Sequence, residues 1–338
     1  MMTLRHLLVA GCALALAGSM AAQARSGGGD QTAGVVVRQV WADAPGGVWT
    51  IAVAPNGRHL AYAGPGHAPR RRAVYVRDLL TAVNRPLTNE DPTGFVVSVT
   101  FSPDSRMVAY TWYNGVRDDQ RLIMLDGSAA PPFPYRHDEW PHSALVGWSP
   151  DGRQMLVAVK TGPLDRQTLH IGLMSVADGS MQILKTFTLK YFPAIGGFST
   201  DGRYVTYDHP ARGDSGERDI FILGTNGGQD VPLVARAADD HNPRFTPDGS
   251  GVVFFSSRAP GEPIGAWYQR VVDGKPRGSP ELFKPDMGPT AQPIGFTSSG
   301  SFFYHTGNEP ITNADRPIRT LWVMENFLPK ADAARTPQ

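Results

Sequence analysis

The chain has 338 residues, of which 41% are hydrophobic and 19% are charged. Its 32 lysines and arginines nearly balance its 31 aspartates and glutamates, so the formal net charge at neutral pH is +1. This balance leaves no excess of positive charge of the kind that binds nucleic acid or an anionic membrane. A chain of this length can bury a hydrophobic core without disulfide bonds.

The first 24 residues have the pattern of a secretory signal peptide. One fixed positive charge, Arg5, precedes an apolar run over residues 7–17, and Ala22-Gln23-Ala24 provides the small-x-small pattern of a cleavage site. The apolar run is too short for a spanning helix, and no later run approaches spanning length. We therefore expect a periplasmic or secreted protein without a membrane span; the alternative is an N-terminal membrane anchor.

The only cysteine, Cys12, lies inside this leader. Val9-Ala10-Gly11-Cys12 also resembles a lipobox, so lipidation of Cys12 stays open as an alternative. Cleavage after Ala24 would leave a chain without a thiol, a disulfide or a cysteine-based metal site. Residues 25–34, rich in Gly and Ser, are expected to form a flexible lead-in.

Residues 35–41, which follow the lead-in, have the composition of a strand but no obvious partner nearby. The last repeat of the chain ends after a third strand at residues 321–324. We predict that residues 35–41 supply the outer strand of this last unit, which would join the two ends of the fold and protect an exposed edge.

One six-residue motif then recurs along the chain: an apolar residue followed by Ser-Pro-Asp-Gly-Arg or a close variant. Its copies begin at Val53, Phe101, Trp148, Phe198, Phe245 and Phe296, roughly 48 residues apart. Pro fixes φ at the first central position of a tight turn, Asp can bond to its own backbone, and Gly takes the positive φ that closes a hairpin. The repeated aspartates are therefore interpreted as turn residues.

A β-rich run follows each motif, and a third strand follows that run. Second turns, each expected to lead into a short fourth strand, lie at Asp126-Gly127, Asp178-Gly179, Asn226-Gly227 and Asp273-Gly274. Four strands in one such period are typical of a propeller blade. The predicted fold class is all-β, a six-bladed β-propeller of four-stranded antiparallel blades over residues 35–328, with a tail at 329–338.

The repeated motif resembles the TolB-like family of bacterial propellers, most closely over residues 239–249, which read Asp-Asp-His-Asn-Pro-Arg-Phe-Thr-Pro-Asp-Gly. The resemblance covers roughly residues 35–328 and implies a propeller fold; propellers of this kind serve as binding modules and as lyase, hydrolase or peptidase-associated domains, and a periplasmic binding role stays open. TolB itself carries an α/β domain ahead of its propeller, and we expect none here, because only residues 25–34 separate the leader from the first strand. We also expect no catalytic domain of the kind that follows the propeller in prolyl-oligopeptidase-type enzymes.

Loops that escape the repeat are the places where binding residues are expected. The densest is the loop before blade three, residues 133–143, with the candidates Arg136, His137, Asp138, Glu139, Trp140 and His142. Histidines and carboxylates can hold a divalent metal or transfer protons, and Trp offers a surface for stacking on a sugar. The alternative is a polar loop, stiffened by proline, whose Trp covers the edge of the blade.

Further candidates lie near blades five and six. The segment entering blade five, residues 237–243, is read as a loop that contributes Asp239, Asp240 and His241, with capping of the strand as the alternative. Arg258, after the second strand of blade five, is a candidate cation facing the central channel. His305 stands where four other blades carry an aromatic residue, and a simple substitution is the alternative.

No motif of a known catalytic centre occurs: there is no G-x-S-x-G, H-E-x-x-H, P-loop or dinucleotide fingerprint. We therefore predict no catalytic residue, and a divalent metal is the only cofactor considered. The first hypothesis is a monomeric, non-catalytic module that binds an envelope or secreted protein or peptide. The second is a propeller-type lyase or hydrolase that acts on a polar, glycan-like substrate at the mouth of the channel.

Overall fold

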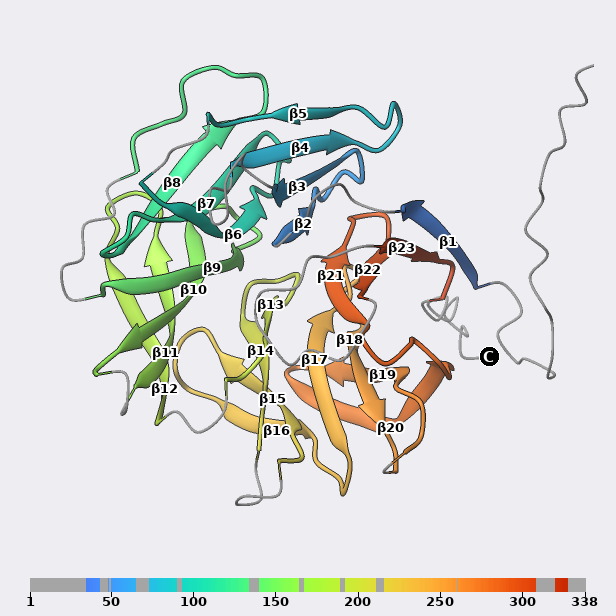
Figure 1. Cartoon of the computed structure of the whole chain (residues 1–338). Helices are drawn as coiled ribbons and strands as arrows, with labels where there is room; N and C mark the ends of the chain where they lie inside the picture. Colours follow the sequence, from blue (N-terminus) through green and yellow to red (C-terminus); the bar gives the residue numbers. More distant parts are fainter. Residues whose placement is uncertain are drawn as a thin grey trace, which may run out of the picture. The chain divides into compact units, whose positions relative to one another are not determined.

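The computed structural model describes residues 35–42, 48, 50–64, 73–89, 93–133, 140–163, 167–188, 192–210, 216–259, 261–307 and 320–327. These residues form six antiparallel sheets arranged as the blades of a propeller (Figure 1). The six-bladed, all-β prediction is confirmed. Within the described residues there is no helix with the length and apolar character needed to cross a membrane.

Each blade is built from strands that follow one another along the chain. Blades one to three comprise β2 (Ile51–Val53), β3 (His59–Ala63), β4 (Val74–Asp78) and β5 (Asn84–Pro86); β6 (Phe95–Phe101), β7 (Met107–Tyr113) and β8 (Asp118–Met124); and β9 (His142–Trp148), β10 (Gln154–Thr161), β11 (Thr168–Ser175) and β12 (Met181–Thr188).

Blades four to six continue the pattern. They comprise β13 (Ile195–Phe198), β14 (Tyr204–His209), β15 (Asp219–Gly224) and β16 (Asp230–Val234); β17 (Asp239–Phe245), β18 (Gly251–Ser257), β19 (Gly265–Val272) and β20 (Lys275–Lys284); and β21 (Gln292–Phe296), β22 (Phe302–Thr306) and β23 (Thr320–Glu325), with β1 (Val36–Trp41) as the fourth strand of blade six.

The first strand of every blade faces the central axis. β2, β6, β9, β13, β17 and β21 contact one another in succession, and β21 contacts β2 again, so the six strands form a closed inner ring. Because neighbouring strands are antiparallel, the repeat turns after the inner strands all lie on one side of the ring, here called the turn face. The inner strands begin on the opposite side, here called the loop face.

The repeat turns have the predicted geometry. In blade three, the amide of Gly152 donates to the carbonyl of Ser149 over 2.9 Å and Gly152 has a φ of +72°. The hydroxyl of Ser149 donates to Asp151 over 2.6 Å, and Asp151 in turn accepts the amide of Arg153 over 3.0 Å. The aspartates of this repeat therefore hold the hairpins together, as the sequence predicted.

The hydrophobic core is divided among the blade interfaces. Six clusters of buried side chains occur in the described residues, one between each pair of adjacent blades. For example, Leu156 and Ile171 of blade three pack with Val205 and Tyr207 of blade four. Each sheet thus buries both faces against its neighbours, which explains why middle strands such as β7 and β18 are largely apolar.

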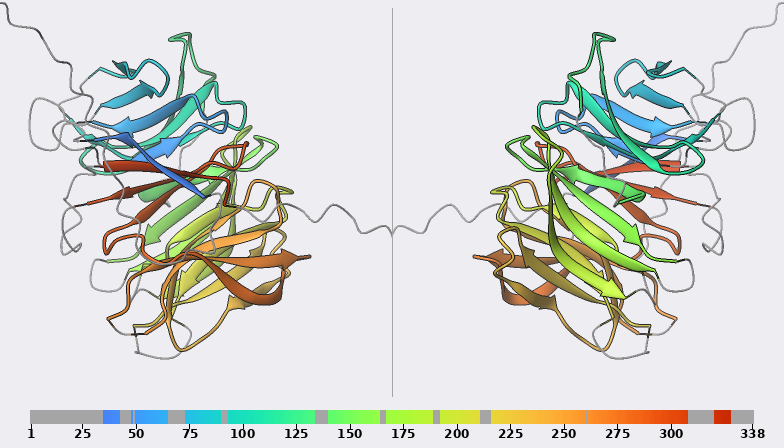
Figure 2. Two further views of the ribbon diagram at one scale, coloured as in Figure 1. Left: turned by 90° about the vertical axis from the view of Figure 1, so that its right-hand side faces the viewer. Right: turned by 90° about the vertical axis from the view of Figure 1, so that its left-hand side faces the viewer.

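The predicted closing strand is confirmed. β1 pairs antiparallel with β23, so the beginning of the propeller completes its last blade (Figures 1 and 2, blue strand beside the red one). Trp41 at the end of β1 is 6% exposed and meets Tyr62 of blade one edge-on, with ring centroids 5.1 Å apart. β1 therefore contacts both of the blades that meet where the ring closes.

One blade departs from the four-stranded prediction. Blade two has three strands within the described residues, and the turn at Asp126-Gly127 leads into irregular chain at residues 128–133 instead of a strand. This segment includes Pro131 and Pro132, which have no amide proton to donate to a neighbouring strand. The two prolines thus explain why no fourth strand forms at residues 128–133, where the repeat predicts one.

Candidate functional site

The candidate residues of blade five lie in an inner strand and not in a loop. Asp239, Asp240 and His241 are the first three residues of β17, on the loop face. The ladder between β17 and β18 is interrupted after His241 by a bulge, where Asn242 takes a φ of +56°. Asn is one of the few residues with a side chain that tolerate this conformation. The sequence prediction of a loop at residues 239–243 was wrong because the bulge and the polar residues disguise a strand.

An arginine from the preceding blade holds the first residue of β17. Arg218 donates from Nε to Oδ1 of Asp239 and from Nη2 to Oδ2, each over 2.7 Å. Its Nη1 lies 3.8 Å from Oδ2 of Asp208, whose side chain is fully buried. Burial opposes ionisation of Asp239, but the bonds and charge of Arg218 hold its pKa below the ordinary value. One arginine therefore joins two carboxylates of blades four and five.

Asp208 fixes the two strand ends that meet beside it. Its Oδ1 accepts the amide of Ala194 and its Oδ2 accepts the amide of Asn242, each over 2.8 Å. Burial raises the pKa of Asp208, and Arg218 with the two amides opposes that shift. The carboxylate thus replaces the ladder partner that Asn242 loses at the bulge.

His241 is buried in the same network. The side-chain amide of Asn242 donates to Nδ1 of His241 over 3.0 Å and to Oε1 of Gln292, in blade six, over 2.9 Å. Burial and the charge of Arg218 lower the pKa of His241 to about 4, although Asp239 opposes them. A neutral imidazole whose Nδ1 already accepts a hydrogen bond is suited to holding strands together.

Asp240 and Arg258 form a second pair in blade five. The Nη1 of Arg258 lies 3.7 Å from Oδ1 of Asp240, and the guanidinium is stacked 3.8 Å from the ring centroid of Trp267. Burial raises the pKa of Asp240 and lowers that of Arg258. Neither carboxylate oxygen of Asp240 has a hydrogen-bond partner among the described residues. This pair is held by charge and stacking, without hydrogen bonds.

The structure pairs His142 with a carboxylate that the sequence did not single out as a site residue. Asp118 begins β8 and His142 begins β9, and His142 Nδ1 lies 3.7 Å from Asp118 Oδ2. The same oxygen accepts the amide of Ser143 over 2.8 Å. Burial raises the pKa of Asp118 to about 6. With 45% of the His142 side chain exposed, this pair presents two titratable groups on the loop face.

The remaining candidates are placed as follows. Arg136, His137, Asp138 and Glu139 lie outside the described residues. Trp140 packs against the core between blades two and three and meets the ring of His170 edge-on at 5.4 Å. His305 lies in β22 between Gln292 and Leu321, and burial lowers its pKa to about 4.

No group of three or more His, Cys, Asp or Glu side chains that could hold a metal ion occurs in the ranges that the structure describes. A metal held with the help of the loop at residues 136–139 stays a prediction. The described candidates His142 and His241 lie in β9 and β17, with β13 of blade four between these two inner strands. These two residues therefore belong to separate clusters along the loop face.

No family model and no curated protein matches the sequence. Solved structures do match. TolB from Acinetobacter baumannii superposes with a TM-score of 0.57 and 16% identity, covering 81% of this chain and 65% of that one. A TolB from Agrobacterium tumefaciens has a TM-score of 0.53 and 18% identity, covering 73% of this chain and 81% of that one.

The chain has the TolB-like six-bladed propeller fold. A second kind of neighbour is an oligogalacturonate lyase in complex with manganese, with a TM-score of 0.54, 12% identity and coverage of 88% of this chain and 97% of that one. At these identities the similarity establishes the fold alone, because one fold hosts unrelated functions. The chain also spans less than two thirds of the length of the Acinetobacter TolB.

Proposed function

We propose that this propeller is an exported binding module that holds a protein or peptide partner on its loop face. The observation that carries the proposal is the Arg218–Asp239 pair. Two hydrogen bonds of 2.7 Å hold Arg218 and Asp239 together on the loop face. Even so, 29% of the Arg218 side chain and 33% of the Asp239 side chain are exposed. A charged pair held in one conformation loses little entropy when it meets a polar partner.

The bonding of the neighbouring side chains favours binding over catalysis. Both oxygens of Asp208 accept backbone amides, and His241 Nδ1 accepts the amide of Asn242. A general base needs a free lone pair directed at its substrate. These groups are engaged within the scaffold, which suits a rigid frame for recognition. The TolB neighbours share the propeller fold, which is consistent with an envelope location.

The proposal is tested by comparing partner retention by two surface variants. In the first, the loop-face residues Arg218 and Asp239 are replaced together by Ala; in the second, the exposed turn-face residues Arg153, Asn226 and Asp273 are replaced by Ala. Each protein is immobilised and exposed to an envelope extract, and retained proteins are identified by mass spectrometry. A partner retained by the wild type and by the turn-face variant, but lost from the loop-face variant, supports the proposal. Equal loss from both variants, or no retained partner, contradicts it.

One observation favours a second candidate function, a lyase or hydrolase acting on a glycan-like substrate. Asp118, whose pKa burial raises to about 6, lies beside the exposed imidazole of His142, and a carboxyl paired with an imidazole can serve in general acid–base catalysis. The lyase among the structural neighbours motivates oligogalacturonate as the substrate to try. The assay follows product formation by absorbance. Activity of the wild type that is lost in Asp118→Asn and in His142→Ala would favour the enzyme. Absence of product would leave the binding module as the better account.

A further inference from the structure

Two repeat turns lack the aspartate that the other four carry. In blades two to four the serine hydroxyl at the second motif position donates to the turn aspartate over 2.6 Å. Blade one has Ala54 and Asn56 at these positions, and blade six has Thr297 and Ser299. The turn carboxylate is therefore missing at both.

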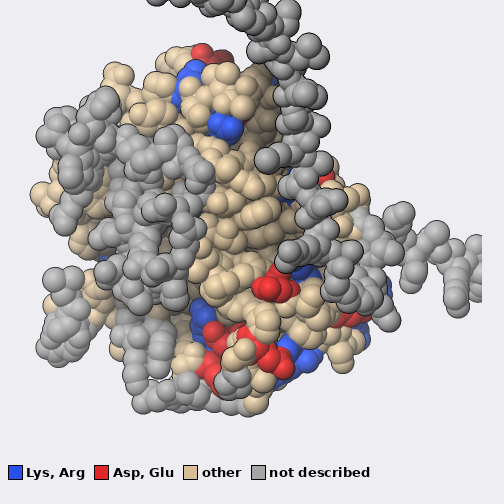
Figure 3. Space-filling view, turned by 45° about the vertical axis from the view of Figure 1, so that its right-hand side comes forward, with Lys and Arg blue, Asp and Glu red and all other residues tan. Residues whose placement is uncertain are grey.

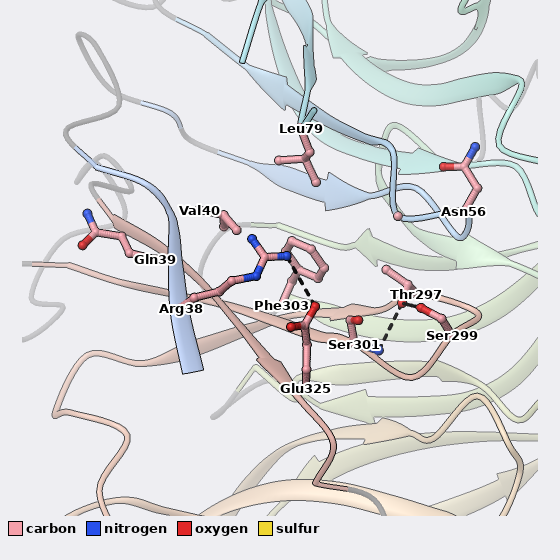
Figure 4. A pocket seen from close by; sticks show the side chains of 11 residues that line it. Arg38, Gln39, Val40, Asn56, Leu79, Thr297, Ser299, Ser301, Phe303 and Glu325 are labelled. Carbon is pink, nitrogen blue, oxygen red and sulfur yellow. Dashed lines mark hydrogen bonds and ion pairs between the residues drawn. The ribbon is translucent and has the colours of Figure 1, made fainter. Parts of the chain in front are cut away.

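These two turns meet where the ring closes. The amide of Ser298 donates to the carbonyl of Pro55 over 2.7 Å, and a Cβ atom at Gly57 would lie 3.3 Å from Cγ2 of Thr297. Together the turns form one wall of a pocket of about 330 Å³ between blades one and six, here called the seam pocket (Figure 4). It opens on the turn face, away from the loop-face residues.

The closing strand and its partner form the opposite wall. Arg38 of β1 and Glu325 of β23 lie 3.4 Å apart across the ladder, so their charges balance (Figure 4). Leu79 and Val40, both partly exposed, supply apolar surface beside this pair, whereas Phe303 is only 3% exposed. A pocket that combines apolar surface with a few polar groups is typical of small-molecule sites.

Several polar groups of the seam pocket have hydrogen-bonding capacity to spare. Asn56 uses Oδ1 to accept the amide of Arg58 over 2.9 Å, whereas its Nδ2 has no partner in the described part of the chain. The hydroxyl of Ser301, which lines the pocket, likewise has no partner among the described residues, whereas the side chain of Gln39 points away from the pocket (Figure 4). These groups donate and accept hydrogen bonds without carrying charge.

We infer that the seam pocket binds a neutral saccharide. Uncharged amide and hydroxyl groups match the alternating donors and acceptors of sugar hydroxyls, and the apolar surface of Val40 and Leu79 matches the C–H face of a sugar ring. The balanced Arg38–Glu325 pair gives no preference for an anion or a cation. This site lies on the opposite side of the ring from the proposed partner surface, so each inference can fail alone.

Calorimetric titration with maltose, cellobiose and diacetylchitobiose tests the inference. We expect at least one of them to bind the wild-type chain in a one-to-one ratio with a Kd below about 10 mM. Digalacturonate, as a charged probe, should bind at least about tenfold more weakly. If none of the neutral sugars binds up to about 10 mM, or if digalacturonate binds best, the inference is wrong.

Variants locate the binding. Asn56→Ala and Ser301→Ala should each weaken it about tenfold, because each removes a hydrogen-bonding group, and Ser301→Trp should abolish it by filling the pocket. Asn226→Ala is the matched control: Asn226 accepts the amide of Gly228 over 2.9 Å in an exposed turn outside the pocket, as Asn56 does within it. Its affinity should equal that of the wild type. Sugar binding that survives all three pocket variants, with unchanged thermal midpoints, would overturn the assignment.

Discussion

At the residue scale, the loop face contrasts a carboxylate that is fully bonded with others that are not. Asp208 accepts two backbone amides, whereas Oδ1 of Asp118 is buried without a hydrogen-bond partner among the described residues. Oδ2 of Asp118 accepts only the Ser143 amide. A buried carboxyl with one bond prefers its neutral form, which explains the raised pKa of Asp118.

This preference makes stability depend on pH, and Asp118→Asn tests it. The pKa of Asp118 is about 6 in the folded chain and near 3.8 when unperturbed, so the folded state binds the proton more tightly. The stabilisation is complete below about pH 4 and is lost as the pH rises through about 6, by up to about 3 kcal/mol. Asn stays neutral and can still accept the Ser143 amide. The variant should therefore be more stable than the wild type above about pH 6 and similar to it near pH 4.

Urea unfolding at a series of pH values measures this difference. Asp119→Asn is the control, because Asp119 is the next residue along β8 and a third of its side chain is exposed. It should follow the wild-type profile. A constant difference between Asp118→Asn and the wild type from pH 4 to 7 would contradict the explanation.

At the element scale, β1 decides whether blade six has an open edge. Without β1, the outer side of β23 would present unpaired amide and carbonyl groups, which invite pairing with other chains. The strand is also anchored by Trp41, which packs on Tyr62 and beneath the guanidinium of Arg77 at 4.7 Å. The hydrogen bonds of β1 therefore join it to blade six, whereas the packing of Trp41 at its end joins it to blade one.

Trp41→Ala should be strongly destabilising for this reason. Trp41 is 6% exposed, and replacing a buried Trp by Ala costs about 3 kcal/mol or more in the free energy of unfolding. Val37→Ala in the same strand is the control, since Val37 is 39% exposed and should cost less than about 0.5 kcal/mol. Chemical denaturation of both variants measures the difference. Similar losses in the two would show that packing of Trp41 does not secure the strand.

The sequence predicts the elements of this fold well because each repeat carries its own turn chemistry. The motif beginning at Trp148 contains every residue of its hairpin, and the pairing of residues 35–41 follows from an incomplete last repeat. The site is harder to predict, because its contacts cross between blades. Asp208 and Asn242 come together only when blades four and five pack, and Asp118 meets His142 through the same kind of interface. In neither pair are the two residues separated in sequence by the repeat length, so the repeat could not predict that they meet.

At the scale of the whole molecule, charge is balanced locally as well as in total. In the view of Figure 3, acidic and basic side chains gather next to one another in the lower part of the surface, and its middle is largely uncharged. This distribution of charge agrees with the formal net charge of +1. A surface without a large excess of one charge favours recognition through specific contacts over long-range attraction. The expectation of a protein or peptide partner is compatible with such a surface.

Closure of the ring also predicts how the propeller unfolds. In an open array of repeats, end units can separate from the rest, but here every blade has two neighbours, and the blade interfaces share the buried core. Trp41→Ala, between blades six and one, and Leu156→Ala, between blades three and four, should both lower the midpoint of one common transition. Calorimetry with fluorescence and circular dichroism as parallel probes would check this. Separate transitions in either variant would contradict it.

The pairing of β1 with β23 has a consequence for the order of events when the chain is made. Arg38 and Glu325 are 287 residues apart in sequence, so the first strand to be synthesised has no partner until the last one exists. Contacts of such long range form late, since the loop between them must first be closed. The ring can therefore close only after β23 has been synthesised. Until then β1 lacks the strand with which it pairs.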